Sequence, residues 1–156
     1  MNHELTLVPS IVPQLHCFTE EGADLKRVRL GDEAYSPALS CFPIIAIDIL
    51  LYSSSQQKFF LAPRKAKPMA GAYWFIGGRI LVGQTVEQAT ASIFKRETKQ
   101  DLDPSRLKFI CNTRYFLKDR EQEPQSAGTD AFAFNFALDI SDVELVITRA
   151  NENMKV

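Results

Sequence analysis

The pattern of hydrophobic and polar positions along the chain predicts several strands around one helix. A nearly continuous apolar run over residues 44–52 has the length of a strand and is typical of a central strand buried on both faces. A polar turn at 53–57 separates this run from residues 58–62, which predicts a β-hairpin. The remaining runs of strand length lie at 73–76, 107–117 and 131–140.

One helix is predicted between these strands, over about residues 86–98. Thr85 and Gln88 have the spacing of a capping box, in which a hydroxyl and an amide satisfy free N–H groups where a helix begins. Apolar side chains then recur at helical spacing and form a core-facing stripe. They are Val86, Ala89, Ile93 and Phe94. Strands that predominate around a single firm helix indicate the α+β fold class.

The chain divides into an N-terminal arm, residues 1–42, and one domain, residues 43–156. The arm is punctuated by prolines and is expected to be irregular, with one short hairpin or helix. With 156 residues, the chain is long enough to bury about two-thirds of its unfolded surface. Residues 141–148 are expected to form a last strand or short helix. A sheet face left uncovered there would expose apolar surface, which predicts self-association as a homodimer.

Charge and composition exclude several classes of function. The formal net charge is −1, which argues against broad binding to nucleic acid or to membrane surfaces. No apolar run approaches the ~20 residues that cross a bilayer, and the N-terminus lacks the order of a secretion signal. Three widely spaced cysteines, Cys17, Cys41 and Cys111, predict reduced and buried thiols in a cytoplasmic protein.

Residues 64–79 contain groups that suit a phosphate ligand. The Gly77-Gly78 pair predicts a tight turn that delivers the chain into the helix and brings backbone groups close to a phosphate. Arg79 follows directly, and Arg64 lies in a basic loop ahead of the turn. A guanidinium matches phosphate oxygens in a bidentate way, so both arginines are candidate ligands. The alternative for Arg64 is a solvated basic loop.

Two carboxylates stand in positions that require a partner. Asp48 interrupts the apolar strand, and a buried carboxylate must be hydrogen-bonded, paired or protonated. A purely structural role for it is a loop cap or an arginine pair. Glu97 lies near the C-terminus of the predicted helix, where the dipole disfavours a negative charge unless a cation is close. The alternative for Glu97 is a surface position beside Lys95 or in solvent.

Two further segments leave alternatives open. Tyr73-Trp74-Phe75 is expected to belong to the core rather than to a base-stacking platform. The charged run Lys118–Gln125 is expected to be a solvated loop. Its alternative is a lid that becomes ordered when a substrate binds.

The segment from Gly71 to Leu102 resembles the signature of the Nudix hydrolases in a degenerate form. That signature is a glycine, five residues, a glutamate, seven residues, Arg-Glu, two residues, Glu-Glu, one residue and a glycine. Gly78 and Glu97 agree with it. The other positions differ: Gln84 replaces the first glutamate, Ser92-Ile93 replaces Arg-Glu, Arg96 replaces the first of the paired glutamates and Lys99 the last glycine.

The surroundings, from Pro43 to Leu138, are similar to the GDP-mannose mannosyl hydrolase branch of that family. The similar segments are the strand Pro43–Asp48, the loop with Arg64 and Pro68, the run Gly71–Arg79 and the triplet Gly128-Thr129-Asp130. The resemblance implies a Nudix-type α/β/α sandwich with a mixed sheet. It also implies a dimeric hydrolase of nucleoside diphosphate-linked sugars or related compounds.

The resemblance assigns roles to particular residues. It implies that Glu97 and the backbone carbonyl of Gly77 bind Mg²⁺, with Mn²⁺ as the other candidate ion. Mg²⁺ suits such a site because it needs few protein ligands. Arg64 and Arg79 would face the diphosphate, and Asp48 would serve the substrate site.

The general base is a point of departure from the resembling branch, which uses a histidine. Tyr115 stands near that position with Arg114 beside it, which makes the first a catalytic and the second a substrate-binding candidate. A neutral tyrosine of pKa ~10 is a poor base at pH 7. Acidic residues of the following loop are the alternatives: Asp119, Glu121 and Glu123.

The degenerate signature also limits the metal chemistry. Ile93 and Arg96 cannot ligate a metal ion, and Arg96 places a positive charge where a second divalent ion would lie. A multi-metal site is therefore not expected. The second hypothesis for the whole chain is a Nudix-fold protein that binds a nucleotide without cleaving it.

Overall fold

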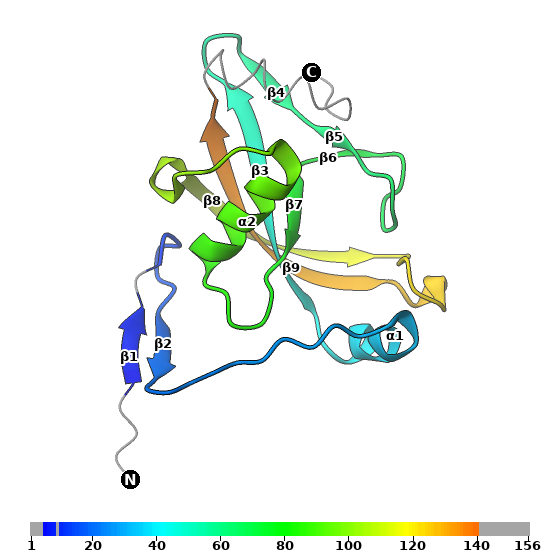
Figure 1. The fold of residues 1–156 in the computed structure, drawn as a ribbon. Helices are drawn as coiled ribbons and strands as arrows, with labels where there is room; N and C mark the ends of the chain where they lie inside the picture. The colour runs from blue at the N-terminus through cyan, green and yellow to red at the C-terminus, as the bar shows by residue number, and fades with distance from the viewer. Residues whose placement is uncertain (1–4, 9, 141–156) are drawn as a thin grey trace.

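The computed structural model describes residues 5–8 and 10–140. In the arm, β1 (Leu5–Val8) pairs antiparallel with β2 (Cys17–Glu20), and α1 (Asp32–Cys41) follows (Figure 1). The arm therefore contains both a hairpin and a helix, where the sequence predicted one of the two. Val12, between the two strands, is 3% exposed and belongs to the main hydrophobic core, so the arm packs onto the domain.

A mixed five-stranded sheet forms the centre of the domain (Figure 1). Four strands lie in the order β4-β3-β9-β8. The fifth, β7, pairs with residues 46–49 of β3, ahead of residues 51–53, which pair with β4. β3 and β9 run parallel, and all other pairs are antiparallel. The bounds are β3 Ile44–Ser53, β4 Lys58–Phe60, β7 Ile76–Arg79, β8 Lys108–Leu117 and β9 Thr129–Asp139. The predicted α+β class and mixed sheet are confirmed.

Short elements connect these strands. β5 (Ala62–Pro63) pairs with β6 (Tyr73–Trp74) at the base of a loop, and 3₁₀ turns cover Pro104–Arg106 and Gln125–Ala127. The predicted final element at 141–148 lies outside the described residues. The expected homodimer stays a prediction, because the structure contains one chain.

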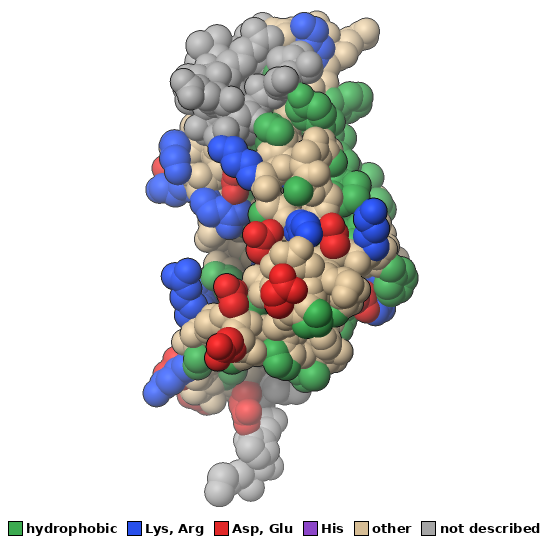
Figure 2. Space-filling view, turned by 90° about the vertical axis from the view of Figure 1, so that its right-hand side faces the viewer, with side chains coloured by type: hydrophobic (Ala, Val, Ile, Leu, Met, Phe, Trp, Pro, Cys, Tyr) green, Lys and Arg blue, Asp and Glu red, His purple; other side chains and the backbone are tan. Residues whose placement is uncertain are grey.

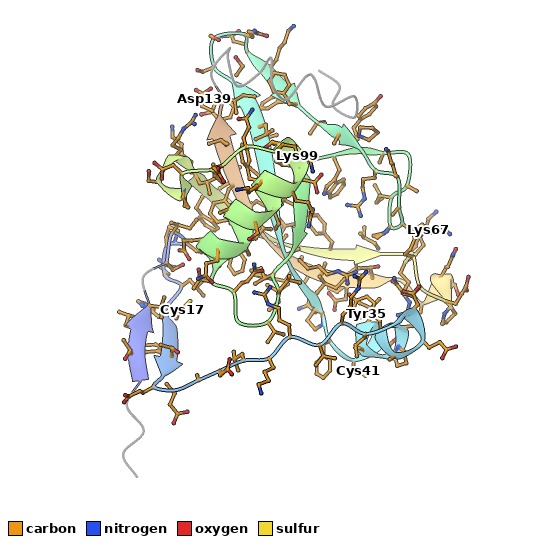
Figure 3. All side chains as sticks on the ribbon, viewed as in Figure 1. Cys17, Tyr35, Cys41, Lys67, Lys99 and Asp139 are labelled. Carbon is orange, nitrogen blue, oxygen red and sulfur yellow. The ribbon has the colours of Figure 1, made fainter. Side chains whose placement is uncertain are left out.

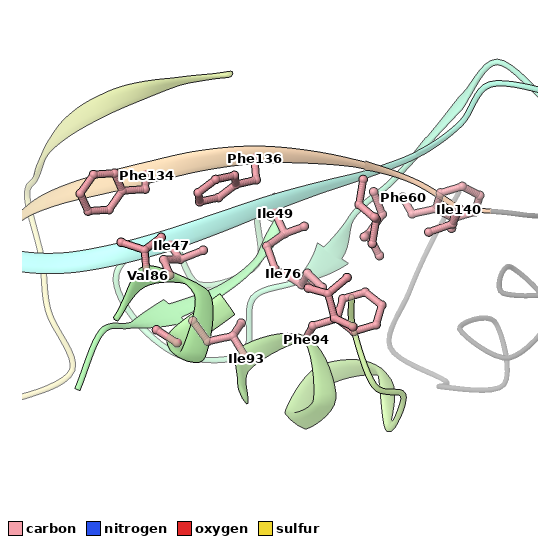
Figure 4. Close-up of a cluster of buried hydrophobic side chains, with 14 of the residues drawn as sticks. Ile47, Ile49, Phe60, Ile76, Val86, Ile93, Phe94, Phe134, Phe136 and Ile140 are labelled. Atoms are coloured by element: carbon pink, nitrogen blue, oxygen red, sulfur yellow. The ribbon is translucent and has the colours of Figure 1, made fainter. Parts of the chain in front are cut away.

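The predicted helix is confirmed as α2, Val86–Thr98, and so is its capping box: the Thr85 hydroxyl accepts from Gln88 N and the Gln88 amide accepts from Thr85 N. The apolar stripe of α2 packs on one face of the sheet (Figure 4). Its partners there include Ile47 and Ile49 of β3, both fully buried. Because side chains alternate along a strand, Asp48 lies on the opposite face.

The predicted glycine turn at Gly77-Gly78 is wrong, because both residues lie in strand β7. Gly77 pairs with Asp48 of β3, and a Cβ at Gly77 would lie 2.5 Å from Asp48 Oδ1 and 2.6 Å from Ile47 O. The glycine is needed for close strand approach and not for a turn. The turn into the helix comes later and contains Gly83, whose φ is +77°.

The cysteines also differ from the prediction. Cys41 and Cys111 are exposed, Cys17 is half-buried, and all three are free thiols. Cys41 ends α1 and Cys111 lies on β8, which pairs with β9 alone among the described strands, so neither position is enclosed. Figure 3 shows that Cys17 and Cys41 lie on separate elements, far from one another.

No helix among the described residues is both long and apolar enough to span a bilayer. On the face shown in Figure 2, acidic and basic side chains both occur among apolar ones, in keeping with the net charge of −1.

Candidate functional site

A cleft of about 230 Å³ opens on the sheet face opposite α2. It is lined by the three strands β3, β7 and β8, by the start of β9, and by the loop that carries Arg64. The lining includes most of the residues singled out from the sequence: Asp48, Arg64, Gly77, Arg79 and Tyr115. Drug-sized ligands fill cavities of roughly 300–1,000 Å³, so a cleft of this size suits one part of a nucleotide, such as its diphosphate.

Asp48 is the one carboxylate among the described residues that line the cleft, and it is 7% exposed. Tyr115 Oη donates to Asp48 Oδ2 at 3.2 Å, and the Trp74 side chain also hydrogen-bonds to this carboxylate. Burial raises the pKa of Asp48, while the two hydrogen bonds and the charge of Arg64 act in the opposite direction. The expectation that this acid requires partners is confirmed.

The raised pKa of Asp48 has a measurable effect on stability. Because the folded chain holds this proton more tightly than the unfolded chain, wild-type stability falls as pH rises from the unfolded pKa through the folded one. Asp48→Asn removes that titration. The free energy of unfolding of Asp48→Asn relative to wild type is therefore expected to increase as the pH rises above about 4, the ordinary pKa of an aspartate. Urea unfolding at several pH values measures this trend.

Asp130→Asn is the control for this experiment. The pKa of Asp130 is lowered by its hydrogen bond to Arg114, so its linkage to stability has the opposite sign, and Asp130→Asn is expected to show no rise in stability relative to wild type as the pH increases. An Asp48→Asn profile that is flat or falls over the same range would contradict the assignment of a raised pKa to this carboxyl group.

Tyr115 acts as a hydrogen-bond donor in this site. Burial, followed by the charge of Asp48, raises the pKa of Tyr115 to about 12, so the phenol stays protonated at neutral pH. Its ring packs edge-on against Trp74, with 5.6 Å between ring centroids. The phenol thus orients Asp48 and is not available as a base in this arrangement.

The loop that carries Arg64 has a defined conformation. Arg64 N donates to Ala72 O and Gly71 N donates to Arg64 O, both at 2.9 Å, and Arg64 Nε donates to Pro68 O at 2.8 Å. The guanidinium carbon lies 5.7 Å from the centroid of the Trp74 ring, within cation–π range. Trp74 therefore forms part of the cleft wall, and the prediction that it belongs to the core is wrong.

Arg79 enters the cleft from β7. Its guanidinium carbon lies 4.6 Å from the centroid of the Tyr35 ring, which α1 supplies. Burial lowers the pKa of Arg79, but a guanidinium stays charged at neutral pH because its reference pKa exceeds 12. Figure 3 shows Tyr35 below and Lys67 above the paired ends of β8 and β9. No local sequence pattern points to Tyr35, which lies in the arm.

The segment after β8, predicted as a solvated loop or a lid, is attached to its neighbours. Arg120 is 3% exposed and donates to Ser36 Oγ at 2.7 Å and to Ser40 Oγ at 3.0 Å, which fixes the loop to α1. Glu121 Oε2 accepts from Lys67 N at 2.8 Å, and Lys67 Nζ donates to Gln125 Oε1. The acidic candidates Asp119, Glu121 and Glu123 do not line the cleft.

Arg114 lies outside the cleft. Since side chains alternate along β8, it points to the opposite face from Tyr115. It forms a bidentate pair with Asp130 on the exposed surface, at 2.9 and 2.6 Å. The structure therefore does not bring Arg114 to the residues expected to bind the substrate.

This architecture is similar to that of several solved structures. No protein-family model and no curated relative matches the sequence. Solved structures do match: a MutT/nudix family protein from Enterococcus faecalis has 17% identity and a TM-score of 0.51 over 65% of this chain and 38% of its own. NrtR from Shewanella oneidensis has 18% identity and a TM-score of 0.55 over 72% of this chain and 50% of its own. A MutT NUDIX hydrolase from Burkholderia pseudomallei has 18% identity and a TM-score of 0.52 over 64% and 68%.

The chain has a Nudix fold. At these identities the likeness concerns the fold, and the chain matches half or less of the length of the first two structures. One neighbour, Shewanella oneidensis NrtR, has also been crystallised with a 27mer DNA, at 16% identity and a TM-score of 0.53. The expectation of no nucleic-acid partner therefore stays a prediction for this chain.

Metal ligation can be tested against the residues at the Nudix signature position. Arg96 Nη2 donates to Gly77 O at 2.8 Å, and Arg96 Nε donates to Glu97 Oε1 at 2.7 Å. The two groups expected to bind Mg²⁺ thus hold a guanidinium between them. Gln84 uses its amide oxygen to accept from Leu81 N at 3.0 Å.

The donor set in this arrangement does not fit a divalent ion. Mg²⁺ and Mn²⁺ require converging oxygen ligands, whereas a guanidinium brings positive charge and donors only. No group of three or more His, Cys, Asp or Glu side chains converges anywhere in the described part of the chain. Ligation by Glu97 and Gly77 stays a prediction from the resemblance, and the chemistry below uses no metal ion.

Proposed function

We propose that this chain is a Nudix-type hydrolase of a nucleoside diphosphate linked to a sugar or a related group, and that the diphosphate binds beside Arg64 and Arg79. The observation that carries the proposal is that these two arginines and Asp48 line one cleft. Guanidinium groups suit diphosphate oxygens because they provide fixed forks of charged donors. Lys67 adds a further cation to the same lining.

The reaction that fits these residues is attack of water on the carbon attached to the diphosphate. The water oxygen forms a bond to that carbon, the bond from the carbon to the diphosphate oxygen breaks, and its electron pair stays on the diphosphate. Asp48 takes the proton that the water loses. A base works best when its pKa is near the working pH, and burial moves the pKa of Asp48 in that direction.

The remaining residues assist this step. Arg64 and Arg79 neutralise the negative charge that builds up on the leaving diphosphate. Tyr115 holds Asp48 in place through its 3.2 Å hydrogen bond. Because the cleft encloses only about 230 Å³, the base and the sugar extend beyond the arginines towards solvent or the neighbouring loops.

Turnover of a panel of nucleotide sugars tests the proposal. Wild-type protein is expected to release free sugar and nucleoside diphosphate, separated by anion-exchange chromatography. Asp48→Asn is expected to lower the rate by about 100-fold or more, since a positioned general base contributes roughly 10²–10⁴-fold. Asp139→Asn is the matched control, because Asp139 lies at the other end of the sheet and accepts from Ser54 N.

The second candidate, nucleotide binding without cleavage, is favoured by one observation. Arg96 bridges Gly77 O and Glu97, so the signature position contributes no carboxylate that is open to a catalytic ion. Calorimetry in which a nucleotide binds while no nucleotide sugar is turned over would select this candidate and reject hydrolysis. If neither binding nor turnover occurs with any compound of the panel, both candidates are rejected.

A further inference from the structure

The Arg96 guanidinium lies between β7 and α2, in a binding position formed by Gly77, Gly78 and Glu97. Its Nη2 atom lies 2.8 Å from Gly77 O, and the same guanidinium approaches Glu97 Oε1 at 2.7 Å through Nε and Nη2. Gly77 also lines the cleft, so the guanidinium is bonded to the backbone of the cleft wall. One cation thus satisfies a strand carbonyl and a helix carboxylate together.

Gly78 makes room for this guanidinium. A Cβ at Gly78 would lie 2.9 Å from Arg96 Nη2, 3.3 Å from Arg96 Nη1 and 3.3 Å from Ile93 Cγ1. The absence of a side chain at Gly78 therefore allows the Arg96 guanidinium to come this close to β7. This position of the guanidinium depends on the packing of α2 against β7 and not on Glu97 alone.

The surrounding charges also disfavour a metal ion at this position. Lys95 precedes Arg96 in the last turn of α2, and Lys99, the C-cap residue, donates from Nζ to Arg96 O at 3.0 Å. Lys95 is paired with Asp101 at 2.7 Å. An exposed ion pair such as Arg96 with Glu97 contributes little to stability because solvent screens it. The pair matters for metal binding instead, because Gly77 O and the Glu97 carboxylate already contact a cation.

We propose that the Arg96 guanidinium is the resident cation of this site and that the chain binds its diphosphate ligand without a divalent metal ion. The part that concerns the ligand rests on the proposed function. The part that concerns Arg96 does not, because it follows from the contacts of Gly77, Gly78 and Glu97. The two parts can therefore fail separately.

Direct Mn²⁺ binding tests the first part, with electron paramagnetic resonance of free Mn²⁺ as the readout. Wild-type protein is expected to bind Mn²⁺ only weakly. Arg96→Glu, which replaces the guanidinium with a second carboxylate beside Glu97, is expected to bind Mn²⁺ at least about tenfold more tightly. Lys95→Glu is the matched control: it makes the same change of charge on the neighbouring exposed residue, and no gain is expected.

Tight Mn²⁺ binding by the wild-type protein that is lost in Glu97→Gln would overturn the proposal. Equal gains in Mn²⁺ affinity in Arg96→Glu and Lys95→Glu would also overturn it, because they would show that net charge, and not the position of Arg96, controls Mn²⁺ binding. Circular dichroism establishes that each variant is folded. If Arg96→Glu does not fold, the wild-type titration and its Glu97→Gln comparison still decide the question.

Calorimetry with ADP tests the second part in the wild-type protein. The dissociation constant of ADP is expected to agree within about twofold in EDTA and in Mg²⁺, after correction for the Mg²⁺–ADP complex in solution. An affinity at least about tenfold higher with Mg²⁺ would overturn metal-free binding. Absence of binding by ADP and by the other common nucleoside diphosphates under both conditions would instead reject the proposed ligand, while the Mn²⁺ result would still report on Arg96.

Discussion

Replacing both Arg64 and Arg79 with glutamine is expected to reduce ADP affinity by hundreds-fold or more. Each arginine removed takes away charge-assisted hydrogen bonds worth roughly 1.5–3 kcal/mol, which corresponds to about 10- to 150-fold in affinity for each single variant. Both guanidinium groups line the same cleft, so a diphosphate that contacts one can contact the other. Isothermal titration calorimetry of the two single variants and the double variant measures the effect.

Arg114→Gln is the matched control for these variants. Arg114 is also an arginine of the sheet, but it is paired with Asp130 on the exposed surface. Its replacement is expected to change ADP affinity by no more than about twofold, as for an ordinary surface substitution. A loss in Arg114→Gln that equals the loss in Arg79→Gln would show that the ligand binds outside the cleft, as the sequence had suggested for Arg114.

Gly77→Ala is expected to destabilise the protein strongly. The new Cβ would meet Asp48 Oδ1 at 2.5 Å and Ile47 O at 2.6 Å, and the second of these atoms belongs to the backbone of the central strand. Overpacking of this kind costs about 1–3 kcal/mol, and a clash with backbone belongs at the upper end. For a chain of this size about 3 kcal/mol corresponds to a fall of roughly 6–12 °C in Tm.

Gly31→Ser is the control for the glycine experiment. A Cβ at Gly31 would meet no atom within 4 Å, its φ is −69°, and it is the N-cap of α1, where serine is favoured. Thermal unfolding of this variant is expected to match or exceed that of wild type. A Gly77→Ala protein with an unchanged Tm would contradict the packing of β7 against Asp48.

Local patterns in the sequence were sufficient for most of the fold. The capping box of Thr85 and Gln88 located the start of α2, because cap hydrogen bonds depend on residues three positions apart. The long apolar runs located β3 and β9, because a buried strand requires a run of that length. The run at 107–117 located β8, although its side chains are exposed or half-buried. Both signals lie within a few residues of chain, and the tertiary structure did not override them.

The errors concern features that depend on residues far apart in the sequence. The local pattern predicts a turn at Gly77, but the glycine is explained by the approach of Asp48 from another strand. The aromatic run predicts a core position for Trp74, whereas its side chain lines the cleft and contacts Arg64 and Tyr115. Tyr35 could not be predicted from the sequence, because only the folded arm brings it to Arg79.

The candidate site, too, could be predicted from the sequence only in part. The sequence predicted that Asp48, Arg64, Arg79 and Tyr115 belong together, and they line one cleft. It also identified Arg96 as a departure from the Nudix signature. It could not show that Arg96 bonds to both Gly77 O and Glu97, because that contact depends on how α2 packs against β7. A fold by itself does not determine a function, so these side chains decide what the Nudix fold does in this chain.

A crystal structure with bound ADP tests the central claim most directly. The account predicts that diphosphate oxygens lie within hydrogen-bond distance of the guanidinium groups of Arg64 and Arg79, next to Asp48. It further predicts that Arg96 keeps its bonds to Gly77 O and Glu97. A nucleotide bound elsewhere, with neither arginine in contact with phosphate, would contradict it.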